Sequence, residues 1–404
     1  MAKITKQSEN FSKWYTDVIL DADLADYGPV KGTMVVKPYG FSLWTHIRDS
    51  LNEMIEESGH ENAYFPLFIP KSFLEKEAKH VEGFAKECAV VTHSKLISED
   101  GSLTVDPDSK LEEEIIVRPT SETIIWHMFK KWITSYRDLP LKVNQWANVV
   151  RWEMRTRLFL RTSEFLWQEG HTAHATKEEA MEETLQIVEI YRTLFEDYLA
   201  IPTMVGRKSN LERFAGADET FSIETMMRDK KALQAGTSHY LGTNFGNAFN
   251  VKFQSKDNKE HPVYATSWGV STRMVGALIM VHGDDKGLKI PPKIAPIQVV
   301  IIPINPKNEK SKEFSSFVTN LEEKLSNLNI RTHVDQLDES PGFKFNKWEL
   351  KGVPLRIEIG LKELENLEIT LCRRDNSEKS QVKIDNINDI SSILDNIQKG
   401  LFND

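Results

Sequence analysis

The chain has 404 residues, of which 40% are hydrophobic and 27% are charged, and its formal net charge is −9. This is the composition of an ordinary soluble globular protein with room for two or three domains, and it excludes a non-specific nucleic-acid binder that relies on a broad basic surface. The polar N-terminus and the lack of any run of roughly 20 apolar residues predict neither a secretory signal nor a membrane span, so we expect a cytoplasmic location.

An amphipathic helix is predicted from residue 38 until Gly59, because apolar residues recur at four-residue steps, at Leu43, Ile47, Leu51 and Ile55. The next segment, AYFPLFIP at residues 63–70, has the pattern of a strand. Pro66 would lie in its middle and cannot donate a backbone hydrogen bond, so we expect this strand at an edge, a bulge or an interface.

A hairpin is predicted after an acidic, irregular insert at residues 98–114: its first strand would span residues 142–152 and its second residues 161–171. Side chains alternate between the two faces of a strand, so one face of the second strand would carry Arg161, Ser163, Phe165, Trp167, Glu169 and His171. A guanidinium, a carboxylate and an imidazole among aromatic rings do not suit a core. This face therefore predicts a ligand site.

The second half of the chain begins with a helix, predicted from the capping box of Thr176 and Glu179 to about residue 199, with an inner stripe of Leu185, Val188, Tyr191 and Leu194. A strand-like AFNVKF follows, and another helix starts near Thr272. Three prolines between residues 291 and 296 predict a domain boundary at about residue 293. The alternating strands and helices beyond it predict a small α/β module.

Five motifs together resemble prolyl-tRNA synthetase, a class II aminoacyl-tRNA synthetase. In chain order they are RPTSET, VVRWE, FLRTSEFLWQEGH, GTSHYLG and SWGVSTR, and the similarity runs from about residue 11 to the C-terminus. The resemblance implies an α+β catalytic domain at residues 1–293, with a mainly antiparallel sheet flanked by helices and class motifs near residues 38–70, 145–171 and 265–283. It also implies an α/β anticodon-binding domain at residues 294–404 and a homodimer that forms across the Pro66 strand.

The subtype follows from the spacing of the motifs. Fewer than a hundred residues separate His174 from Ser267, whereas the bacterial type of this family inserts a large editing domain between its second and third motifs. The chain thus looks like the archaeal and eukaryotic type. That type usually carries a further C-terminal domain, which is absent from this sequence ending at Asp404; either the protein is naturally short or the sequence is a piece of a longer one.

The implied reaction joins L-proline to ATP with release of pyrophosphate and then transfers the prolyl group to tRNA(Pro). The nucleophile is the carboxylate of the substrate, so the protein contributes positioning and charge stabilisation at the α-phosphate, for which arginine is suited. The resemblance assigns catalytic roles to Arg151 and Arg273. It assigns ATP binding to Arg151, Glu153, Arg161, Phe165, Gln234, Thr237, Ser271 and Arg273.

Recognition of proline requires hydroxyl and carboxylate acceptors beside an apolar wall, because the ligand is a compact ring with a secondary ammonium. The resemblance assigns this pocket to Thr120, Glu122, Arg151, Trp167, Glu169, His171, Phe214, His239 and Ser267. A single histidine is more often a satisfied core residue than a ligand, but the surrounding GTSH favours the pocket for His239.

Mg²⁺ is the expected cofactor, bridging ATP phosphates with few protein ligands. Gln234 and Glu224 are its candidate ligands, although Glu224 could equally be a structural acid. The two cysteines, Cys88 and Cys372, are solitary, so we expect neither a disulfide framework nor a zinc site.

RNA recognition is predicted in PGFKFNKWELKGVPLRIEIG, where basic residues alternate with aromatic rings that could stack on bases. The residues assigned to the anticodon are Lys344, Lys347, Glu349 and Arg356. Glu349 would accept hydrogen bonds from guanine. The alternative for the lysines is a solvated amphipathic helix.

Two other functions remain open from the residues alone. A paralogue that has lost aminoacylation and acts as a binding or regulatory protein would be expected to have broken signature positions. A class II enzyme for threonine, serine or glycine would lack the EFLWQEGH pocket. The expected partners are L-proline, ATP, tRNA(Pro) and a second copy of the chain, with no membrane association.

Overall fold

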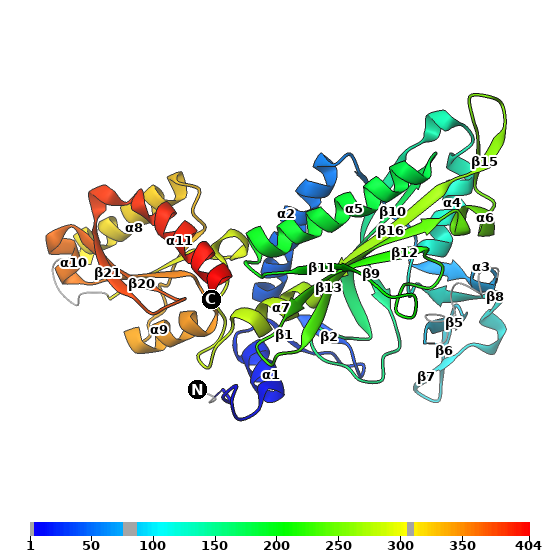
Figure 1. Ribbon diagram of the computed structural model, residues 1–404. Helices are drawn as coiled ribbons and strands as arrows, with labels where there is room; N and C mark the ends of the chain where they lie inside the picture. Colours follow the sequence, from blue (N-terminus) through cyan, green and yellow to red (C-terminus); the bar gives the residue numbers. More distant parts are fainter. Residues whose placement is uncertain (1–3, 76–86, 305–310) are drawn as a thin grey trace.

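The chain folds around two separate sheets, seen side by side in Figure 1. The computed structural model describes residues 4–75, 87–304 and 311–404. The larger sheet has seven strands in the order β11-β12-β13-β16-β10-β9-β3, and the smaller has five in the order β18-β17-β19-β20-β21. All pairs in the larger sheet are antiparallel except β3 with β9.

The seven-stranded sheet forms the floor of the functional site. Its strands are β3 (Glu61–Asn62), β9 (Leu141–Val150), β10 (Glu164–His174), β11 (Met204–Arg207), β12 (Glu219–Met226), β13 (Ala232–Gly242) and β16 (Tyr264–Ser271). The predicted hairpin is present as β9 and β10, but β10 begins at Glu164. Arg161 and Ser163 therefore precede the strand and do not share its alternating face.

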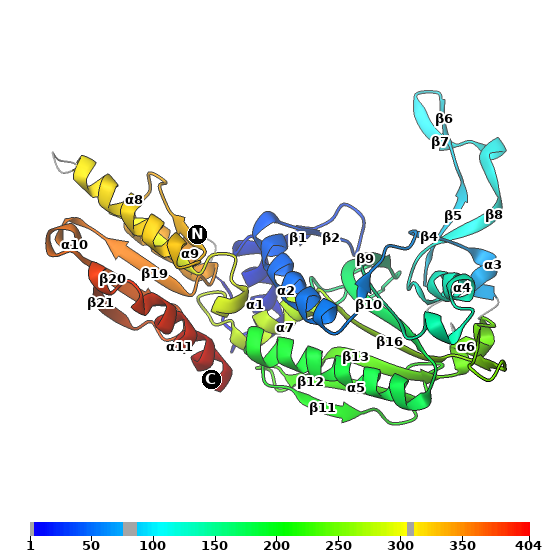
Figure 2. The same cartoon turned by 90° about the horizontal axis from the view of Figure 1, so that it is seen from above.

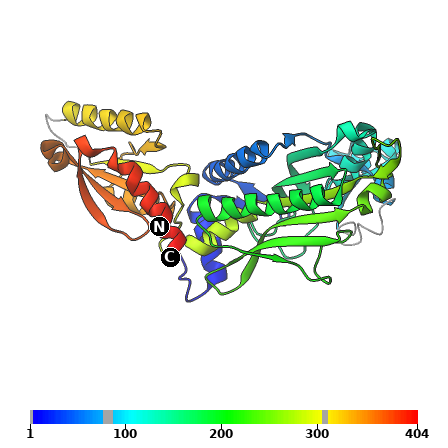
Figure 3. The same ribbon diagram turned by 45° about the horizontal axis from the view of Figure 1, so that its top comes forward.

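The helices of the larger part are α1 (Phe11–Asp21), α2 (Pro38–Glu57), α3 (Lys71–Glu75), α4 (Glu122–Trp132), α5 (Lys177–Thr193), α6 (Asn244–Ala248) and α7 (Arg273–His282). Of these, α5 covers one face of the sheet, whereas α4 packs in one cluster with Ala173 on the other face. Figure 3 shows α5 lying along the strands, where it contacts β10, β12, β13 and β16. The hydroxyl of Tyr191 on α5 bonds the side-chain amide of Gln168 on β10 at 2.7 Å, so the neighbouring residues of β10, on either side of Gln168, point to the opposite face.

Several local predictions are confirmed. The helix at residues 38–57 buries all four of its periodic apolar residues. The capping box of Thr176 and Glu179 opens α5, which continues into a π-helical turn at Leu194–Tyr198. The inner stripe of α5 is right at three positions and wrong at Leu185, which is 44% exposed.

Two predictions, at residues 63–70 and at residues 98–114, are wrong. Residues 63–70 do not form one strand: only Phe68–Pro70 is extended in a sheet, as β4, and Pro66 lies in the irregular segment before it. Residues 98–114 are not irregular, because they include a hairpin of β6 (Leu96–Glu99) with β7 (Ser102–Val105) and most of β8 (Lys110–Val117). Figure 2 shows this hairpin projecting away from the rest of the molecule.

Three small sheets complete the larger part. β4 and β5 (Ala89–His93) flank β8, β1 (Ala25–Tyr27) pairs with β2 (Met34–Val36), and β14 (Lys252–Gln254) pairs with β15 (Glu260–Pro262). The strand-like AFNVKF is split between α6 and β14.

The smaller part follows Pro292–Ile294, a 3₁₀ turn within the predicted proline-rich boundary. Its strands are β17 (Val299–Pro303), β18 (Thr332–Val334), β19 (Leu355–Ile359), β20 (Glu368–Arg373) and β21 (Lys379–Lys383). Its helices are α8 (Ser311–Asn327), α9 (Pro341–Leu350), α10 (Leu361–Asn366) and α11 (Asp389–Asn403). β17 is parallel to β18 and β19, while β20 and β21 are antiparallel to their neighbours, so the module is α/β with a mixed sheet.

The two parts are joined by charged contacts. Arg374 binds Asp284 through two nitrogens at 2.6 and 2.9 Å, and Lys286 pairs with Glu349 at 3.0 Å. Among the described residues, none of the helices has the length and apolarity needed to cross a bilayer.

Acid is expected to destabilise this fold through His282, at the end of α7. Burial lowers the pKa of its imidazole to about 4, and Nε2 donates to Leu199 O at 2.8 Å. Because the unfolded chain takes up this proton from about pH 6.5 downward and the folded chain does not, stability falls between pH 6.5 and 4 by up to about 1.4 kcal/mol per pH unit. Urea unfolding at pH 6.5, 5.5 and 4.5 should show a shallower loss for His282→Gln. His261→Gln, at an exposed position, is the control, and parallel curves for wild type and His282→Gln would contradict the prediction.

Candidate active site

A cavity of about 290 Å³ lies on the face of the sheet that α5 leaves open. Strand register sets its order: Trp167, Glu169 and His171 of β10 lie opposite Ser271, Gly269 and Ser267 of β16. On the next strand, Thr237 and His239 lie opposite Gly269 and Ser267. The cavity therefore has one end at His171, Ser267 and His239, and another at Trp167 and Ser271.

The structure brings most of the predicted site residues into this cavity. It is lined by Thr120, Glu122, Arg151, Phe165, Trp167, Glu169, His171, Phe214, Gln234, Thr237, His239, Ser267, Ser271 and Arg273. These residues come from segments more than 150 positions apart, and the antiparallel register of three strands is what places them together.

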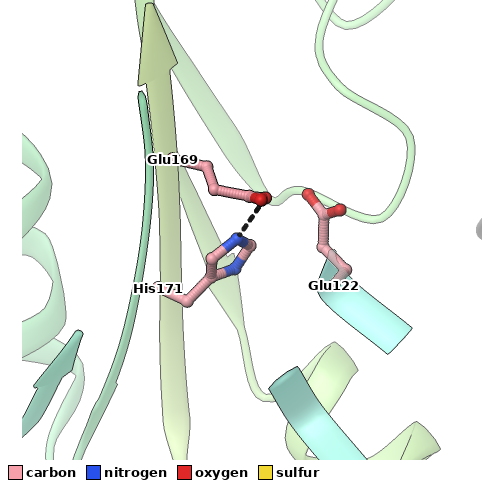
Figure 4. Close-up of side chains that lie close together, drawn as sticks. All are labelled: Glu122, Glu169 and His171. Atoms are coloured by element: carbon pink, nitrogen blue, oxygen red, sulfur yellow. Dashed lines mark hydrogen bonds and ion pairs between the residues drawn. The ribbon is translucent and has the colours of Figure 1, made fainter. Parts of the chain in front are cut away.

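A buried polar cluster forms one wall, with Glu169 and His171 on β10 facing Glu122 at the start of α4 (Figure 4). His171 Nε2 donates to Glu169 Oε2 at 3.1 Å, and Gln145 Nε2 donates to Glu169 Oε1 at 2.8 Å. Burial alone would raise the pKa of Glu169, but its bond to His171 and the donors Ser121 and Gln145 outweigh burial and lower that pKa. Burial opposes protonation of His171, and the two carboxylates overcome it and raise the pKa of the imidazole. Both shifts favour the form in which a charged imidazolium faces a carboxylate.

Glu122 differs from Glu169, since burial raises its pKa despite the nearby charges of His171 and Arg151. Its Oε2 is buried without a hydrogen-bond partner, as are His171 Nδ1, Ser267 Oγ and Trp167 Nε1. Buried polar atoms are nearly always paired in native proteins. Four such atoms around one cavity indicate a polar ligand that completes their bonds.

His239 closes the far end of the cavity. Its Nδ1 lies 2.9 Å from Thr220 Oγ1, and its ring packs on Phe214 with centroids 4.7 Å apart. Burial, and then the charges of Lys208 and His171, lower the pKa of His239 to about 3. The imidazole is thus neutral near pH 7 and offers an uncharged, partly apolar wall.

Two arginines connect this cavity to a second one of about 230 Å³. Arg151 donates from Nε to Pro119 O at 2.9 Å, and its guanidinium lies 5.2 Å from the Trp167 ring and 5.5 Å from the Phe165 ring. Arg273 is the first residue of α7 and donates to Leu160 O at 3.2 Å. A helix N-terminus and two guanidinium groups create a positive region suited to phosphates.

The second cavity contains the remaining predicted ATP residues. Glu153 and Arg161 line it, 3.6 Å apart, together with Phe165, Ser271 and both shared arginines. The two cavities thus provide adjoining compartments, one with a buried acid–imidazole cluster and one rich in arginine.

The two candidate Mg²⁺ ligands differ in their access to the cavity. Glu224 and Gln234 lie opposite each other on β12 and β13, but only Gln234 lines the cavity. Their oxygens suit a hard cation, yet Gln234 Oε1 already accepts a hydrogen bond from Lys208 Nζ. Among the described residues, the one group of three or more side chains close enough to share a metal ion is Glu122, Glu169 and His171.

Lys208, Glu212 and Thr220 also line the cavity and were not predicted. Thr220 reaches it because it pairs with His239 across β12 and β13, a contact that no local pattern indicates. For Lys208 and Glu212 the one available signal was their position a few residues before Phe214.

The predicted anticodon residues lie on and after α9 but differ in access. Lys344 is 3% exposed and its Nζ donates to Asp335 O at 2.9 Å, so this lysine packs inside the module and its burial does not favour a contact with RNA phosphate. Lys347, Glu349 and Arg356 are partly exposed and pair with Asp335, Lys286 and Glu358, respectively. An RNA contact at these three positions would have to replace or extend an existing ion pair.

Comparison with known proteins agrees with both parts of the molecule. Residues 104–282 match the tRNA synthetase class II core domain (G, H, P, S and T), and residues 298–391 match an anticodon binding domain. A proline–tRNA ligase of Flavobacterium johnsoniae is 56% identical over 404 residues, which cover 99% of this chain and 82% of the relative. The chain belongs to the proline–tRNA ligase family.

Other members of this family are similarly related. The proline–tRNA ligase of Porphyromonas gingivalis is 56% identical over 406 residues, covering 100% of this chain and 82% of the relative. That of Bacteroides fragilis is 57% identical over 403 residues, covering 99% and 81%. The predicted α+β class is confirmed by the two family matches and by the antiparallel sheet with its helices.

Proposed function

We propose that this protein is a proline–tRNA ligase, which activates L-proline with ATP to prolyl-adenylate and pyrophosphate and then transfers proline to the 3′ end of tRNA(Pro). The observation that carries the proposal is the pair of adjoining cavities sharing Arg151 and Arg273. One compartment suits a small amino acid and the other a phosphate chain. Membership of the proline–tRNA ligase family supports proline as that amino acid.

Proline would occupy the compartment formed by Thr120, Glu122, Trp167, Glu169, His171, Phe214, His239 and Ser267. The secondary ammonium would lie against Glu122, whose buried carboxyl has an unpartnered oxygen, and binding a cation there would favour its ionised form. The rings of Trp167 and Phe214 would contact the pyrrolidine. The charged pair of Glu169 and His171, held by Gln145, would fix the wall rather than take part in bond making.

ATP would occupy the second compartment, with its adenine on Phe165 and its phosphates near Arg161 and Arg273. An oxygen of the proline carboxylate attacks the α-phosphorus, and the bond from that phosphorus to the pyrophosphate oxygen breaks. Arg151, which borders both compartments, would neutralise the carboxylate before attack and the α-phosphate as its charge grows. Glu153, Thr237 and Ser271 would complete the nucleotide contacts.

Mg²⁺ would be held mainly by the ATP phosphates and would neutralise the leaving pyrophosphate. Gln234 is the better candidate for a protein ligand of Mg²⁺. Glu224 would be the second candidate, through its position opposite Gln234 on the neighbouring strand. We propose no zinc site. The proposal also includes a cytoplasmic location.

The proposed subtype is the archaeal and eukaryotic type, without the large editing insertion. Its support is that residues 175–266 form α5 with its π-helical turn, strands of the main sheet, and the short elements α6, β14 and β15. We propose a catalytic domain at residues 1–293 and an anticodon-binding domain at residues 294–404, in which Lys347, Glu349 and Arg356 contact tRNA. A homodimer through the region around Pro66 is part of the same proposal, supported by exposed Tyr64 and Phe68 on either side of it.

The purified chain should catalyse exchange of pyrophosphate into ATP that depends on proline and not on threonine, serine or glycine. It should also charge tRNA(Pro). The first assay separates a ligase from a silent paralogue, and the amino-acid panel separates it from other class II enzymes. Absence of exchange with every amino acid, from protein that is folded by circular dichroism, would contradict the proposed function.

A further inference from the structure

Lys208 supplies an unassigned positive charge at the centre of the cavity. It follows β11, its backbone N–H donates to Thr220 O at 2.8 Å, and its side chain lines the cavity and ends on Gln234 Oε1. None of the described carboxylates forms an ion pair with its ammonium. A partly buried cation that bonds only a neutral amide remains available to an anionic ligand.

The register of the sheet shows where this cation lies in the cavity. Thr220, beside the Lys208 backbone, lies opposite His239 at the end of the cavity that would hold proline. Gln234, where the ammonium ends, lies five residues from His239 along β13, in the direction of the Ser271 and Arg273 end. The Lys208 side chain therefore spans from the amino-acid end to the nucleotide end, on the wall opposite Arg151.

We propose that Lys208 is a further catalytic residue, whose ammonium leaves Gln234 and binds the α-phosphoryl group of ATP during attack by the proline carboxylate. This inference rests on the proposed function. The α-phosphoryl group would then lie between Arg151 on the β9 and β10 side and Lys208 on the β12 and β13 side. A cation on each side stabilises the negative charge that develops on the α-phosphoryl oxygens. Removal of one such stabilising group commonly lowers the rate by about 10²–10³.

The test compares Lys208→Met, which keeps the length and apolar stem, with Lys208→Arg and with Lys231→Met. Lys231 is exposed in the turn between β12 and β13 and does not line the cavity. In proline-dependent ATP–pyrophosphate exchange, Lys208→Met should lower kcat/KM for ATP about 100-fold, Lys208→Arg should recover a large part of that loss, and Lys231→Met should match wild type. Proline binding without ATP, followed by fluorescence of the tryptophans, should stay within about twofold of wild type for all three.

A double-mutant cycle with Gln234→Ala separates a contact to ATP from a role in holding Gln234. If Lys208 contacts phosphate, Lys208→Met remains harmful in the Gln234→Ala background. The proposal is overturned if Lys208→Met loses its effect in that background, if exchange is unchanged, or if proline binding falls while the ATP parameters stay the same. Failure of the proposed function would appear differently, as a wild-type protein without proline-dependent exchange.

Discussion

Replacing Arg151 with alanine is expected to abolish proline-dependent ATP–pyrophosphate exchange, with a loss of about 1000-fold. The side chain borders both cavities, is held by Pro119 O at 2.9 Å, and lies against the rings of Phe165 and Trp167. Its removal leaves the carboxylate and the α-phosphate facing each other without the charge between them, which raises the barrier for attack. Exchange measured over a range of ATP and proline concentrations tests this.

The matched control is Arg155→Ala, which removes an exposed arginine from the loop between β9 and β10 that lines neither cavity. It should leave kcat/KM close to wild type. Exchange by Arg151→Ala at the rate of Arg155→Ala would remove Arg151 from the proposed mechanism. Equal losses in both variants would point to the loop as a whole.

Replacing Glu169 with alanine is expected to destabilise the catalytic part by about 3–5 kcal/mol and to remove measurable proline binding. Glu169 is 2% exposed and accepts from His171 and Gln145, so its loss leaves a buried imidazole without the partner that keeps it charged. Urea unfolding gives the stability and tryptophan fluorescence gives proline binding. Because the pKa of His171 is raised on folding, the free-energy loss should be largest below about pH 6.5, its unfolded value, and should shrink as the pH rises through the folded-state pKa.

The double variant Glu169→Gln with His171→Gln serves as the control, because it removes both charges and keeps their volume. Replacing both members of a buried pair is much less costly than removing one. This variant should therefore recover most of the stability without recovering proline binding. Wild-type stability in Glu169→Ala would show that the pair contributes nothing to folding.

The sequence predicted those elements whose signals are local. The four-residue period of α2, the capping box of Thr176 and Glu179, and the start of α7 beside Thr272 each depend on neighbours within a few positions. The strand predicted at residues 63–70 was less accurate. Pro66 was placed inside a strand, although only the segment after it pairs with β8.

The sequence also did not predict correctly which side chains are exposed to solvent. Lys344 belongs to a basic and aromatic pattern, but it faces inward because α9 packs it against Asp335. Leu185 fits the spacing of the predicted stripe, yet it stays exposed, because α5 turns Thr184 and Ile187 inward instead. A periodic pattern gives the spacing of side chains and not the width of the surface that buries them.

The sequence by itself determined the chemistry offered by this protein, since the order of its motifs and the alternating face of Phe165, Trp167, Glu169 and His171 indicated an arginine-rich nucleotide site joined to an amino-acid pocket. Only the tertiary structure decided which side chains face one another. The antiparallel register of β10, β16, β13 and β12 sets Glu169 beside Gly269, Gly269 beside Thr237, and His239 beside Thr220. It also carries Lys208 to Gln234, because contacts between strands depend on pairing across the sheet and not on distance along the chain.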